Sequence, residues 1–408
     1  MKCWANTLLM FVLVIVLFFP ACCVSEDSAM PSLENLFCIK EHKCFFIPYD
    51  NDMAGKSVGI FTVLKDDTFL IGESGNTCYR VNCEGVILNR FTLIHPDQND
   101  MSVQILAGGG EGDQYVFASC DYANSTCIID VAAPDGSIHH SETISVGLKY
   151  ASPIEEGLLL CGYQEVQSEK ANQSQLSPWA AKVDYSGKIV WEYTEISSPE
   201  NNGTGYNQIA ELGYSDVNDT YLVCREYGAE LQWYILRLDE NGDLVDKKLL
   251  SLESYMSNGS IEVHDVIAKD NILLLEVSAF ENQMSTGSTS CLIAIKEAEV
   301  LWEYRSPKNS RIVWFSENGN DIVSIKTDEN ENCAEFNLIG FSSEDQNAFE
   351  LPLAYAERTQ DSGFEIWIPK LIRSEDGKIW GAGVLTSYSP SDMHSYLFMT
   401  CFDLKGIS

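Results

Sequence analysis

Short apolar runs separated by acidic or glycine-containing turns recur along most of this chain. Each unit reads as an apolar strand, a turn, two further strands, and then Asp-x-x-Gly or a relic of it, and the pattern occurs seven times between Thr62 and Ser408. A repeating unit of about fifty residues made only of short strands is typical of a β-propeller, in which each small sheet buries its faces against its neighbours. We therefore predict an all-β, seven-bladed β-propeller. Matching strands begin, 42 to 63 residues apart, at Phe69, Val116, Leu158, Tyr221, Ile272, Ile322 and Ile379.

The third unit shows how a blade divides into four strands. The second strand is expected at Leu158 to Tyr163 and the third at Trp179 to Val183, and Gln164 to Ser177 between them is expected to be an exposed loop. The last turn, Asp184 to Gly187, ends in a glycine that supplies the positive φ of a tight hairpin. Equivalent turns are predicted at Asn82 to Gly85, Pro134 to Gly136, Asp239 to Gly242 and Asp403 to Gly406.

The seventh unit ends soon after its turn and therefore lacks an outer strand. An unpaired edge would remain at this point of the ring. The segment Phe37 to Pro48 precedes the first unit and has strand composition. We predict that it pairs with Tyr396 to Asp403 and closes the ring as the outer strand of the last blade.

The N-terminus resembles an export leader. Trp4 to Val24 is an uncharged, apolar run that follows Lys2. Phe19 to Cys22 resembles a bacterial lipobox, which predicts lipidation at Cys22; cleavage after Ser25 and a retained anchor are the alternatives. We interpret residues 1–25 as a signal peptide or lipoprotein leader, 26–36 as a tether and 37–408 as one propeller domain. All three alternatives place the globular part outside the cytoplasm, attached to the cell envelope or secreted.

Acidic residues dominate the charge of the chain. Sixty Asp and Glu against 26 Lys and Arg give a formal net charge of −34. Such a surface repels phosphate backbones and anionic lipid headgroups, so nucleic acid is not expected as a partner. The acidic residues are spread along the chain instead of forming an acidic tail.

The chain contains 14 cysteines, and export makes disulfides permissible. Cys120 and Cys127 flank a predicted hairpin turn, so their Cβ atoms are expected to face each other across adjacent strands, and we predict a disulfide between them. A bond from Cys401 to Cys38 or Cys44 is a second hypothesis, because it would lock the closure of the ring. The remaining cysteines in apolar strands are interpreted as small buried hydrophobes, and these are Cys161, Cys224, Cys291, Cys333 and Cys401.

The stretch Val183 to Glu192, which contains Asp-x-x-Gly-x-x-x-Trp, resembles the repeat of pyrroloquinoline-quinone-like β-propellers, and Val300 to Tyr304 is similar to a second copy. The resemblance implies that the glycine makes the hairpin and that Trp191 packs between neighbouring blades. Three other units carry Asn89, His140 and Asp246 at the tryptophan position.

The resemblance indicates a fold and not a cofactor. Quinone-dependent dehydrogenases of this group generally have eight blades and an adjacent cysteine pair beside the cofactor. This chain has seven predicted blades, and its adjacent pair, Cys22 and Cys23, lies in the leader. The closer likeness is to non-catalytic envelope lipoproteins, and no cofactor is expected.

Few residues suggest chemistry. The six histidines have no metal-binding spacing, and no nucleophile elbow is present. Ala107 to Asp113 is rich in glycine but precedes a strand, so we interpret it as a connecting loop. Asp239, Asn241 and Asp243 alternate as in calcium loops, yet the glycine is misplaced, which favours a hairpin turn.

Trp314 and Trp367 are the candidate ligand-binding residues. They occupy similar predicted inner-strand positions in successive units, so they could line the central channel and stack a sugar, although core packing is the commoner role. We expect a non-enzymatic, membrane-tethered module that binds a protein or glycan. The alternative is a propeller enzyme, such as a hydrolase, lyase or sulfotransferase, with its site at the channel mouth.

Overall fold

The computed structural model describes residues in both of the compact units into which the chain divides, Met1–Phe37 and Cys38–Ser408. The first unit contributes only β1 (Leu36–Phe37). The predicted leader, Cys22 and nearly all of the predicted tether therefore lie outside the described residues. The described residues are 36–37, 43–47, 58–73, 77–93, 103–111, 114–167, 174–195, 207–216, 218–228, 231–250, 252, 261–269, 271–279, 289–296, 299–307, 310–329, 333–342, 347–357, 363–368, 371–374, 377–389 and 392–402.

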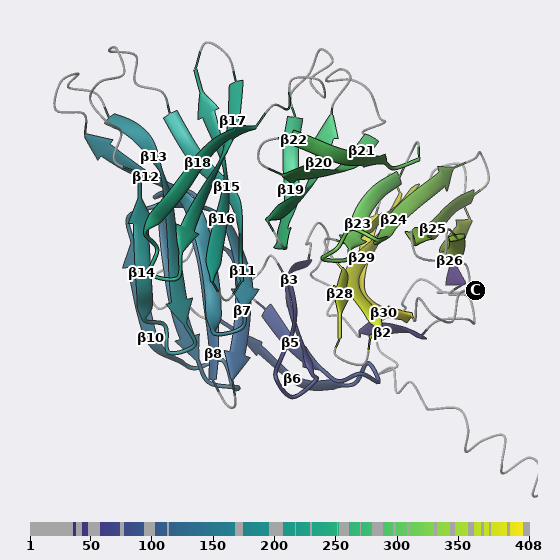
Figure 1. Ribbon diagram of the computed structural model, residues 1–408. Helices are drawn as coiled ribbons and strands as arrows, with labels where there is room; N and C mark the ends of the chain where they lie inside the picture. The colour runs from purple at the N-terminus through teal and green to yellow at the C-terminus, as the bar shows by residue number, and fades with distance from the viewer. Residues whose placement is uncertain are drawn as a thin grey trace, which may run out of the picture. The chain divides into compact units, whose positions relative to one another are not determined.

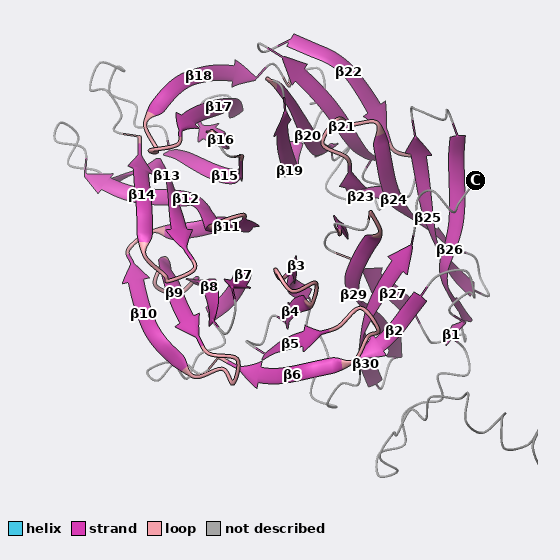
Figure 2. Cartoon of the chain, turned by 60° about the horizontal axis from the view of Figure 1, so that its bottom comes forward, coloured by secondary structure: helices cyan, strands magenta, loops and turns pink. Residues whose placement is uncertain are grey.

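The second unit, Cys38–Ser408, is a ring of seven antiparallel sheets (Figures 1 and 2). The sheets follow one another in chain order, and the first four contain four consecutive strands each. The all-β, seven-bladed prediction is confirmed. The first four blades are β3 (Val58–Val63), β4 (Phe69–Glu73), β5 (Thr77–Val81) and β6 (Ile87–Thr92); β7 (Val103–Glu111), β8 (Gln114–Asp121), β9 (Thr126–Ala132) and β10 (Ile138–Ile144); β11 (Gly147–Ile154), β12 (Gly157–Gln167), β13 (Ser174–Asp184) and β14 (Ile189–Thr194); β15 (Asn207–Ser215), β16 (Asp219–Tyr227), β17 (Leu231–Asp239) and β18 (Leu244–Leu250).

The fifth to seventh blades follow the same plan, with one added piece in the last. Two short strands, β27 and β28, share the innermost position of the seventh blade, since both pair with β29. These blades are β19 (Ile261–Lys269), β20 (Ile272–Ala279), β21 (Thr289–Lys296) and β22 (Glu299–Arg305); β23 (Ser310–Phe315), β24 (Asp321–Glu329), β25 (Cys333–Ser342) and β26 (Asn347–Glu357); β27 (Gly363–Trp367), β28 (Leu371–Arg373), β29 (Ile379–Ser389) and β30 (Asp392–Phe402), with β2 (Lys43–Ile47) outermost.

The N-terminal strand β2 completes the seventh blade, as predicted. It pairs antiparallel with β30, from Lys43 opposite Cys401 to Ile47 opposite Leu397. The register places Cys44 opposite Thr400, so Cys44 is not the residue that faces Cys401. This disfavours the hypothesised bond between them, because cross-strand bridging requires directly opposed positions. The other partner considered for it, Cys38, lies outside the described residues.

The core lies between blades. Each described cluster of buried apolar side chains joins two successive blades, because alternate residues of a strand point to opposite faces of its sheet. Trp179 and Trp233, each at most 2% exposed, are the largest side chains in these layers. Burial on both faces explains why the inner strands read as continuous apolar runs.

Four of the five predicted glycine turns are confirmed, and the fifth, Asp403 to Gly406, lies outside the described residues. Gly85, Gly136, Gly187 and Gly242 have φ between 78° and 83°, the left-handed region that favours glycine. In each turn the glycine N–H donates to the carbonyl oxygen three residues earlier, as from Gly187 to Asp184 at 2.9 Å. The candidate calcium residues Asp239 and Asn241 lie in such a turn.

Two predicted loops are wrong. Ala107 to Glu111 is the end of strand β7, where glycine allows close approach: a Cβ on Gly108 would lie 2.7 Å from the Phe117 ring. At both ends of the stretch from Gln164 to Ser177 the chain is strand, since Gln164 to Gln167 in β12 pair with Ser174 to Ser177 in β13; residues 168–173 lie outside the description. Polar side chains do not prevent pairing, because the ladder uses backbone groups.

Candidate functional site

A tryptophan fills the boundary between the third and fourth blades. Trp191 in β14 is 7% exposed, and its indole lies against the backbone of Gly242 in the last turn of the fourth blade. A Cβ on Gly242 would come within 2.9 Å of that ring. The packing that the family resemblance implies for this tryptophan is therefore present. Trp302 packs in a related way against Gly319 of the sixth blade.

Other residues occupy the tryptophan position at three boundaries. Between the first and second blades, the Asn89 amide donates a hydrogen bond to the carbonyl oxygen of Pro134, and Phe91 packs on Gly136. Between the second and third blades, Val131 and His140 face Gly187. At both boundaries the residue at the tryptophan position contacts the next blade, and a neighbouring apolar side chain, Phe91 or Val131, lies against the turn glycine.

Two surface grooves lie at boundaries that lack the tryptophan. One, of about 470 Å³, is shallow and runs between the outer strand of the second blade and the last turn of the third; it is lined by His140, Glu142, Ser186, Lys188 and Ile189. The other, of about 270 Å³, is more enclosed and lies between the fourth and fifth blades. We call the second the 4/5 groove; it is lined by Tyr221, Ile235, Arg237, Asp246, Lys248, Leu250, Asn271, Leu273 and Ile295.

Strand register brings the polar residues of the 4/5 groove together. Tyr221 in β16 lies opposite Arg237 in β17, which in turn lies opposite Asp246 in β18. Lys248 is two residues after Asp246 and therefore points to the same face of the sheet. Three neighbouring strands thus place one aromatic and three charged side chains in a row that faces the fifth blade.

The charges in the 4/5 groove balance each other loosely. Lys248 Nζ lies 3.0 Å from Asp246 Oδ2, and Arg237 Nη1 lies 4.0 Å from Asp219 Oδ2. The Nε–H of Arg237 is buried and has no hydrogen-bond partner within the described part of the chain. Burial raises the pKa of the Tyr221 hydroxyl, as does the negative charge of Asp219, while Arg237 opposes this shift. The tyrosine therefore stays neutral at physiological pH.

The fifth blade and the lower part of the fourth supply the rest of the wall. Ile235, Leu250, Leu273 and Ile295 contribute apolar surface. Asn271 lies in the turn before β20 with φ 62°, a conformation that asparagine tolerates better than most residues. The lining of the groove therefore combines apolar side chains with hydrogen-bonding groups.

The other face of β18 has a different role. Lys247 points toward the third blade, where its Nζ lies 2.7 Å from Glu195 Oε1 and 4.1 Å from the centre of the Tyr234 ring. Successive residues of one strand thus serve two boundaries: Lys247 closes one and Lys248 lines the other.

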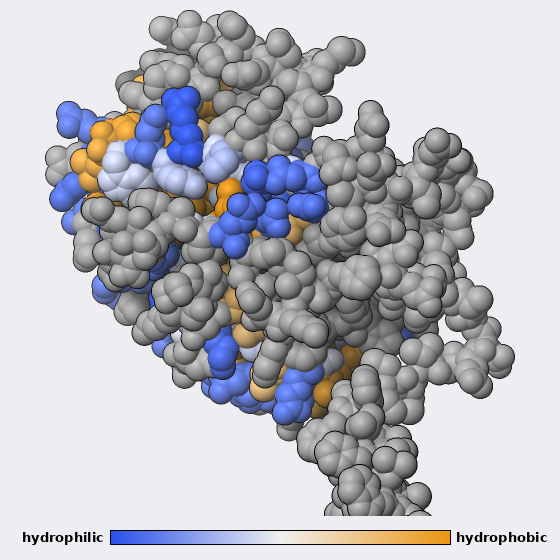
Figure 3. All heavy atoms as spheres, turned by 90° about the vertical axis from the view of Figure 1, so that its right-hand side faces the viewer, coloured by the Kyte–Doolittle hydropathy of each residue, from blue (hydrophilic) through white to orange (hydrophobic). Residues whose placement is uncertain are grey.

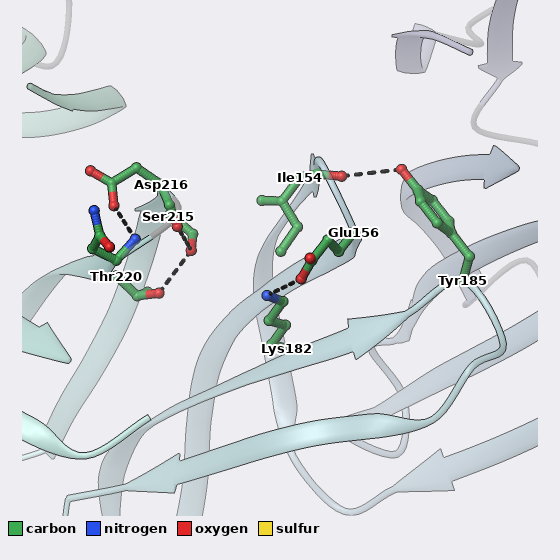
Figure 4. A network of polar contacts seen from close by, with 8 residues as sticks. Ile154, Glu156, Lys182, Tyr185, Ser215, Asp216 and Thr220 are labelled. Carbon is green, nitrogen blue, oxygen red and sulfur yellow. Dashed lines mark hydrogen bonds and ion pairs between the residues drawn. The ribbon is translucent and has the colours of Figure 1, made fainter. Parts of the chain in front are cut away.

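A second polar network lies at the end of the blades that carries the glycine turns (Figure 4). In the third blade, Tyr185 donates to the Ile154 carbonyl oxygen at 3.1 Å, and Lys182 pairs with Glu156 at 2.9 Å. In the fourth blade, Ser215 and Thr220 share a hydrogen bond of 2.9 Å. These groups satisfy one another, so we assign them to turn structure.

The sequence-predicted tryptophans are on inner strands as expected. Trp314 lies in β23 and is half-buried, and Trp367 lies in β27. Whether they stack a ligand stays a prediction. Trp314 is not among the residues that line the 4/5 groove, and the side chain of Trp367 is outside the description.

The cysteines occupy the positions that the sequence suggested. Cys120 in β8 is directly opposite Cys127 in β9, and both are buried in one cluster. The disulfide between them stays a prediction. Cys161, Cys224, Cys291 and Cys401 are at most 6% exposed, which confirms them as buried residues; the side chain of Cys333 is outside the description. Burial raises the pKa of the Cys161 thiol, so it is a poor nucleophile.

The sequence missed Tyr221, Arg237, Lys248 and Asn271 as site residues. Asp246 at the tryptophan position was the signal that could have found them, because a short acidic side chain there leaves room between two blades. In the described part of the chain, no group of three or more His, Cys, Asp or Glu residues is placed to hold a metal ion. No helix among these residues is long and apolar enough to cross a membrane.

Apolar side chains also reach the surface of the ring. The face shown in Figure 3 has hydrophobic patches bordered by hydrophilic residues. On the outer strands, large apolar side chains are 37 to 53% exposed, and these are Val86, Leu88, Val190, Leu244, Val245, Leu249, Val300, Leu301 and Trp302. Single exposed apolar residues are common on soluble proteins, so this distribution alone defines no site.

Comparison with known proteins gives no family. No protein-family model matches the chain, and no curated protein matches it. Among solved structures, BamB from Moraxella catarrhalis is 11% identical with a TM-score of 0.39, covering 84% of this chain and 85% of that one. The Dos1 propeller is 10% identical with a TM-score of 0.46 and coverages of 89% and 95%. Quinohemoprotein alcohol dehydrogenase from Comamonas testosteroni is 9% identical with a TM-score of 0.40 and coverages of 82% and 65%. The seven-bladed fold and the groove are established by this chain's own strand pairing and side chains.

Proposed function

We propose that this protein is an exported, membrane-tethered binding module that holds a component of the cell envelope in the 4/5 groove without altering it chemically. One observation carries the proposal: a partly open groove with charged and apolar lining lies at a position of the repeat that holds a packed tryptophan one boundary earlier. Packing alone would be served better by an apolar side chain, because buried polar groups need partners. The groove is also lined by charged side chains that stay partly exposed, with Arg237 at 34%, Asp246 at 38% and Lys248 at 48%, and these can donate to or accept from a ligand.

The proposed location, outside the cytoplasm and attached to a membrane, is inferred from the N-terminal sequence. The apolar run Trp4 to Val24 supports export, and the resemblance to a lipobox supports lipid attachment at Cys22. Labelled palmitate should enter the full chain in a bacterial host that processes lipoproteins and should not enter a Cys22→Ser variant. Export also permits the Cys120–Cys127 bond, which non-reducing peptide mapping of exported protein should find. Free thiols at both positions in exported protein would remove that bond from the proposal.

The binding function is tested by capture. The full chain, solubilised in detergent and immobilised, is incubated with a detergent extract of the envelope of the organism that makes it. We expect saturable capture by the natural chain, loss of capture by Asp246→Trp, which fills the groove, and full capture by Lys247→Met, which changes the opposite face of the same strand.

The outcomes of this capture experiment separate the alternatives. Capture that Asp246→Trp leaves intact would place binding elsewhere and refute the groove as the ligand site. A captured component whose mass changes with time would identify a propeller enzyme instead of a binding module. Circular dichroism of each variant shows whether the β-sheet fold is retained.

A further inference from the structure

We propose that the 4/5 groove binds the pyranose ring of a neutral sugar, so that the envelope component is a glycan. This proposal rests on the binding function proposed above and adds the chemical class of the ligand. It is carried by the charge, the hydrogen-bonding groups and the size of the groove.

The charge of the groove favours a neutral ligand. The lining holds two cations, Arg237 and Lys248, and one anion, Asp246. Asp219 lies outside the lining but 4.0 Å from Arg237 Nη1, and its charge brings the local formal total to zero. An anionic ligand would meet the Asp246 carboxylate in the lining and the repulsion of a chain with a net charge of −34. A cationic ligand would meet the guanidinium and the ammonium group. A neutral polar molecule avoids each of these penalties.

The polar groups of the groove match adjacent hydroxyls. A sugar hydroxyl both donates and accepts, so it is satisfied where donors and acceptors lie side by side. The partly exposed guanidinium of Arg237 and the ammonium of Lys248 offer donors, and the Asp246 carboxylate directly across the strand pair from Arg237 offers an acceptor. Hydrogen bonds to charged groups are stronger than neutral ones, which gives orientation as well as affinity.

The remaining surface of the groove matches the apolar face of a sugar ring. Tyr221 is an amphipathic aromatic residue, and Leu250, Leu273 and Ile295 add apolar surface. A volume of about 270 Å³ lies just below the range of pockets that hold drug-sized ligands, roughly 300 to 1,000 Å³. One ring of a longer glycan would occupy it, with the rest of the chain in solvent.

The direct test uses small neutral sugars. The full chain in detergent is titrated with the methyl glycosides of glucose, galactose, mannose and N-acetylglucosamine, with saturation-transfer NMR as the readout, and with acetate and succinate as anionic probes. We expect at least one glycoside to bind in the millimolar range, and the two anions not to bind. Asp246→Asn, which keeps the shape of the side chain, and Arg237→Met should each weaken that binding about tenfold or more. Lys247→Met should leave it unchanged.

The captured envelope material gives the second test. Periodate, which cleaves vicinal diols, should abolish capture, and protease treatment should not. If no glycoside binds and capture is sensitive to Asp246→Trp and to protease but not to periodate, the ligand is a protein segment; the sugar proposal is then wrong and the groove remains the binding site. If binding of glycosides is the same in the natural chain, Asp246→Asn and Arg237→Met, the groove is not the sugar site. If Asp246→Trp captures the envelope component as well as the natural chain does, then neither the 4/5 groove as the binding site nor the sugar as its ligand is supported, and both proposals are wrong.

Discussion

Two neighbouring boundaries of the ring differ at one position of the repeat. At the boundary between the third and fourth blades, Trp191 lies against Gly242 and is almost completely buried. At the next boundary the equivalent residue is Asp246, which is 38% exposed in its side chain and lines the 4/5 groove. The strands on both sides are otherwise alike, with four-stranded sheets in the same order.

The residue at the tryptophan position differs between these two boundaries, although the buried layer between the blades is present at both. A propeller blade needs an apolar layer on each face, and both boundaries have one, around Leu222 and Tyr234 on one side and Val223 and Trp233 on the other. At the first boundary Trp191 is part of that layer, whereas at the second the layer forms without Asp246. This position of the repeat therefore holds either a packed indole or a side chain that leaves a groove.

The largest expected loss of stability follows from removing the Trp191 side chain, which fills the boundary between the third and fourth blades. Trp191→Ala should lower the free energy of unfolding by about 3 to 5 kcal/mol, because it removes a buried aromatic side chain from a packed boundary. Urea denaturation followed by circular dichroism measures it. Val190→Ala, on the same strand at 53% exposure, is the control and should change stability by less than about 0.5 kcal/mol. Equal effects of the two substitutions would contradict the role of Trp191 as the closing residue.

Gly242→Ala changes the other partner of the contact between Trp191 and Gly242. The new Cβ would be strained at φ 83° and would lie 2.9 Å from the Trp191 ring. We expect a loss of roughly 2 to 4 kcal/mol in the same denaturation assay. Gly377→Ala is the matched control, because φ is 84° but the nearest group to the new Cβ is the Arg373 guanidinium at 3.7 Å. It should cost only the backbone strain, about 1 to 2 kcal/mol. A loss for Gly242→Ala no greater than for Gly377→Ala would show that the indole moves aside freely.

The sequence and the family resemblance together predicted the boundary that Trp191 fills. The Asp-x-x-Gly spacing indicates the hairpin glycine, which is a local property, whereas the packing of Trp191 four residues later was implied by the resemblance. Ring closure was also predictable, because a missing outer strand and an orphan strand must meet. The position of Cys120 opposite Cys127 followed from the length of one turn.

The groove between the fourth and fifth blades could be predicted from the sequence only in part. Asp246 was visible as an exception to the repeat, but the groove also needs Asn271 and Leu273 from the next blade, and their approach depends on how two sheets pack. Backbone closeness was equally hidden: Gly108 reads as a loop residue, yet it is glycine because the Phe117 ring leaves no space for a Cβ. Such facts are long-range, so local patterns do not contain them.

A smaller effect is expected from the turn that packs the third blade on the second. Asp184 Oδ1 accepts hydrogen bonds from the Ser186 N–H, the Ser186 hydroxyl and the Lys188 N–H at 2.6 to 3.0 Å. Partial burial raises the pKa of the Asp184 carboxyl, but these hydrogen bonds outweigh it and hold the pKa below its ordinary value. Asp184→Asn should lower stability at pH 6 by roughly 1 kcal/mol.

The pH dependence of that substitution has a definite sign. A carboxyl whose pKa is lower in the folded protein stabilises the fold fully above its ordinary pKa of about 3.9, and this contribution is lost as the pH falls through the folded pKa. The stability difference between the natural chain and Asp184→Asn should therefore be present at pH 6 and shrink below about pH 3.9 in urea titrations. A difference that is constant with pH would mean that the turn does not depend on the charge.

The smallest change in stability is expected at the boundary between the fourth and fifth blades, which holds the 4/5 groove. Asp246→Ala should change the free energy of unfolding by less than about 0.5 kcal/mol, because its contact with Lys248 is a solvent-exposed ion pair, with the two side chains 38% and 48% exposed. The same urea assay that measures Trp191→Ala measures this variant, so the two boundaries are compared directly. A loss of 2 kcal/mol or more would mean that Asp246 holds the fourth and fifth blades together and serves structure, as Trp191 does. A neutral result combined with lost capture would instead assign this position to ligand binding, since a residue that the fold does not need is then required for function.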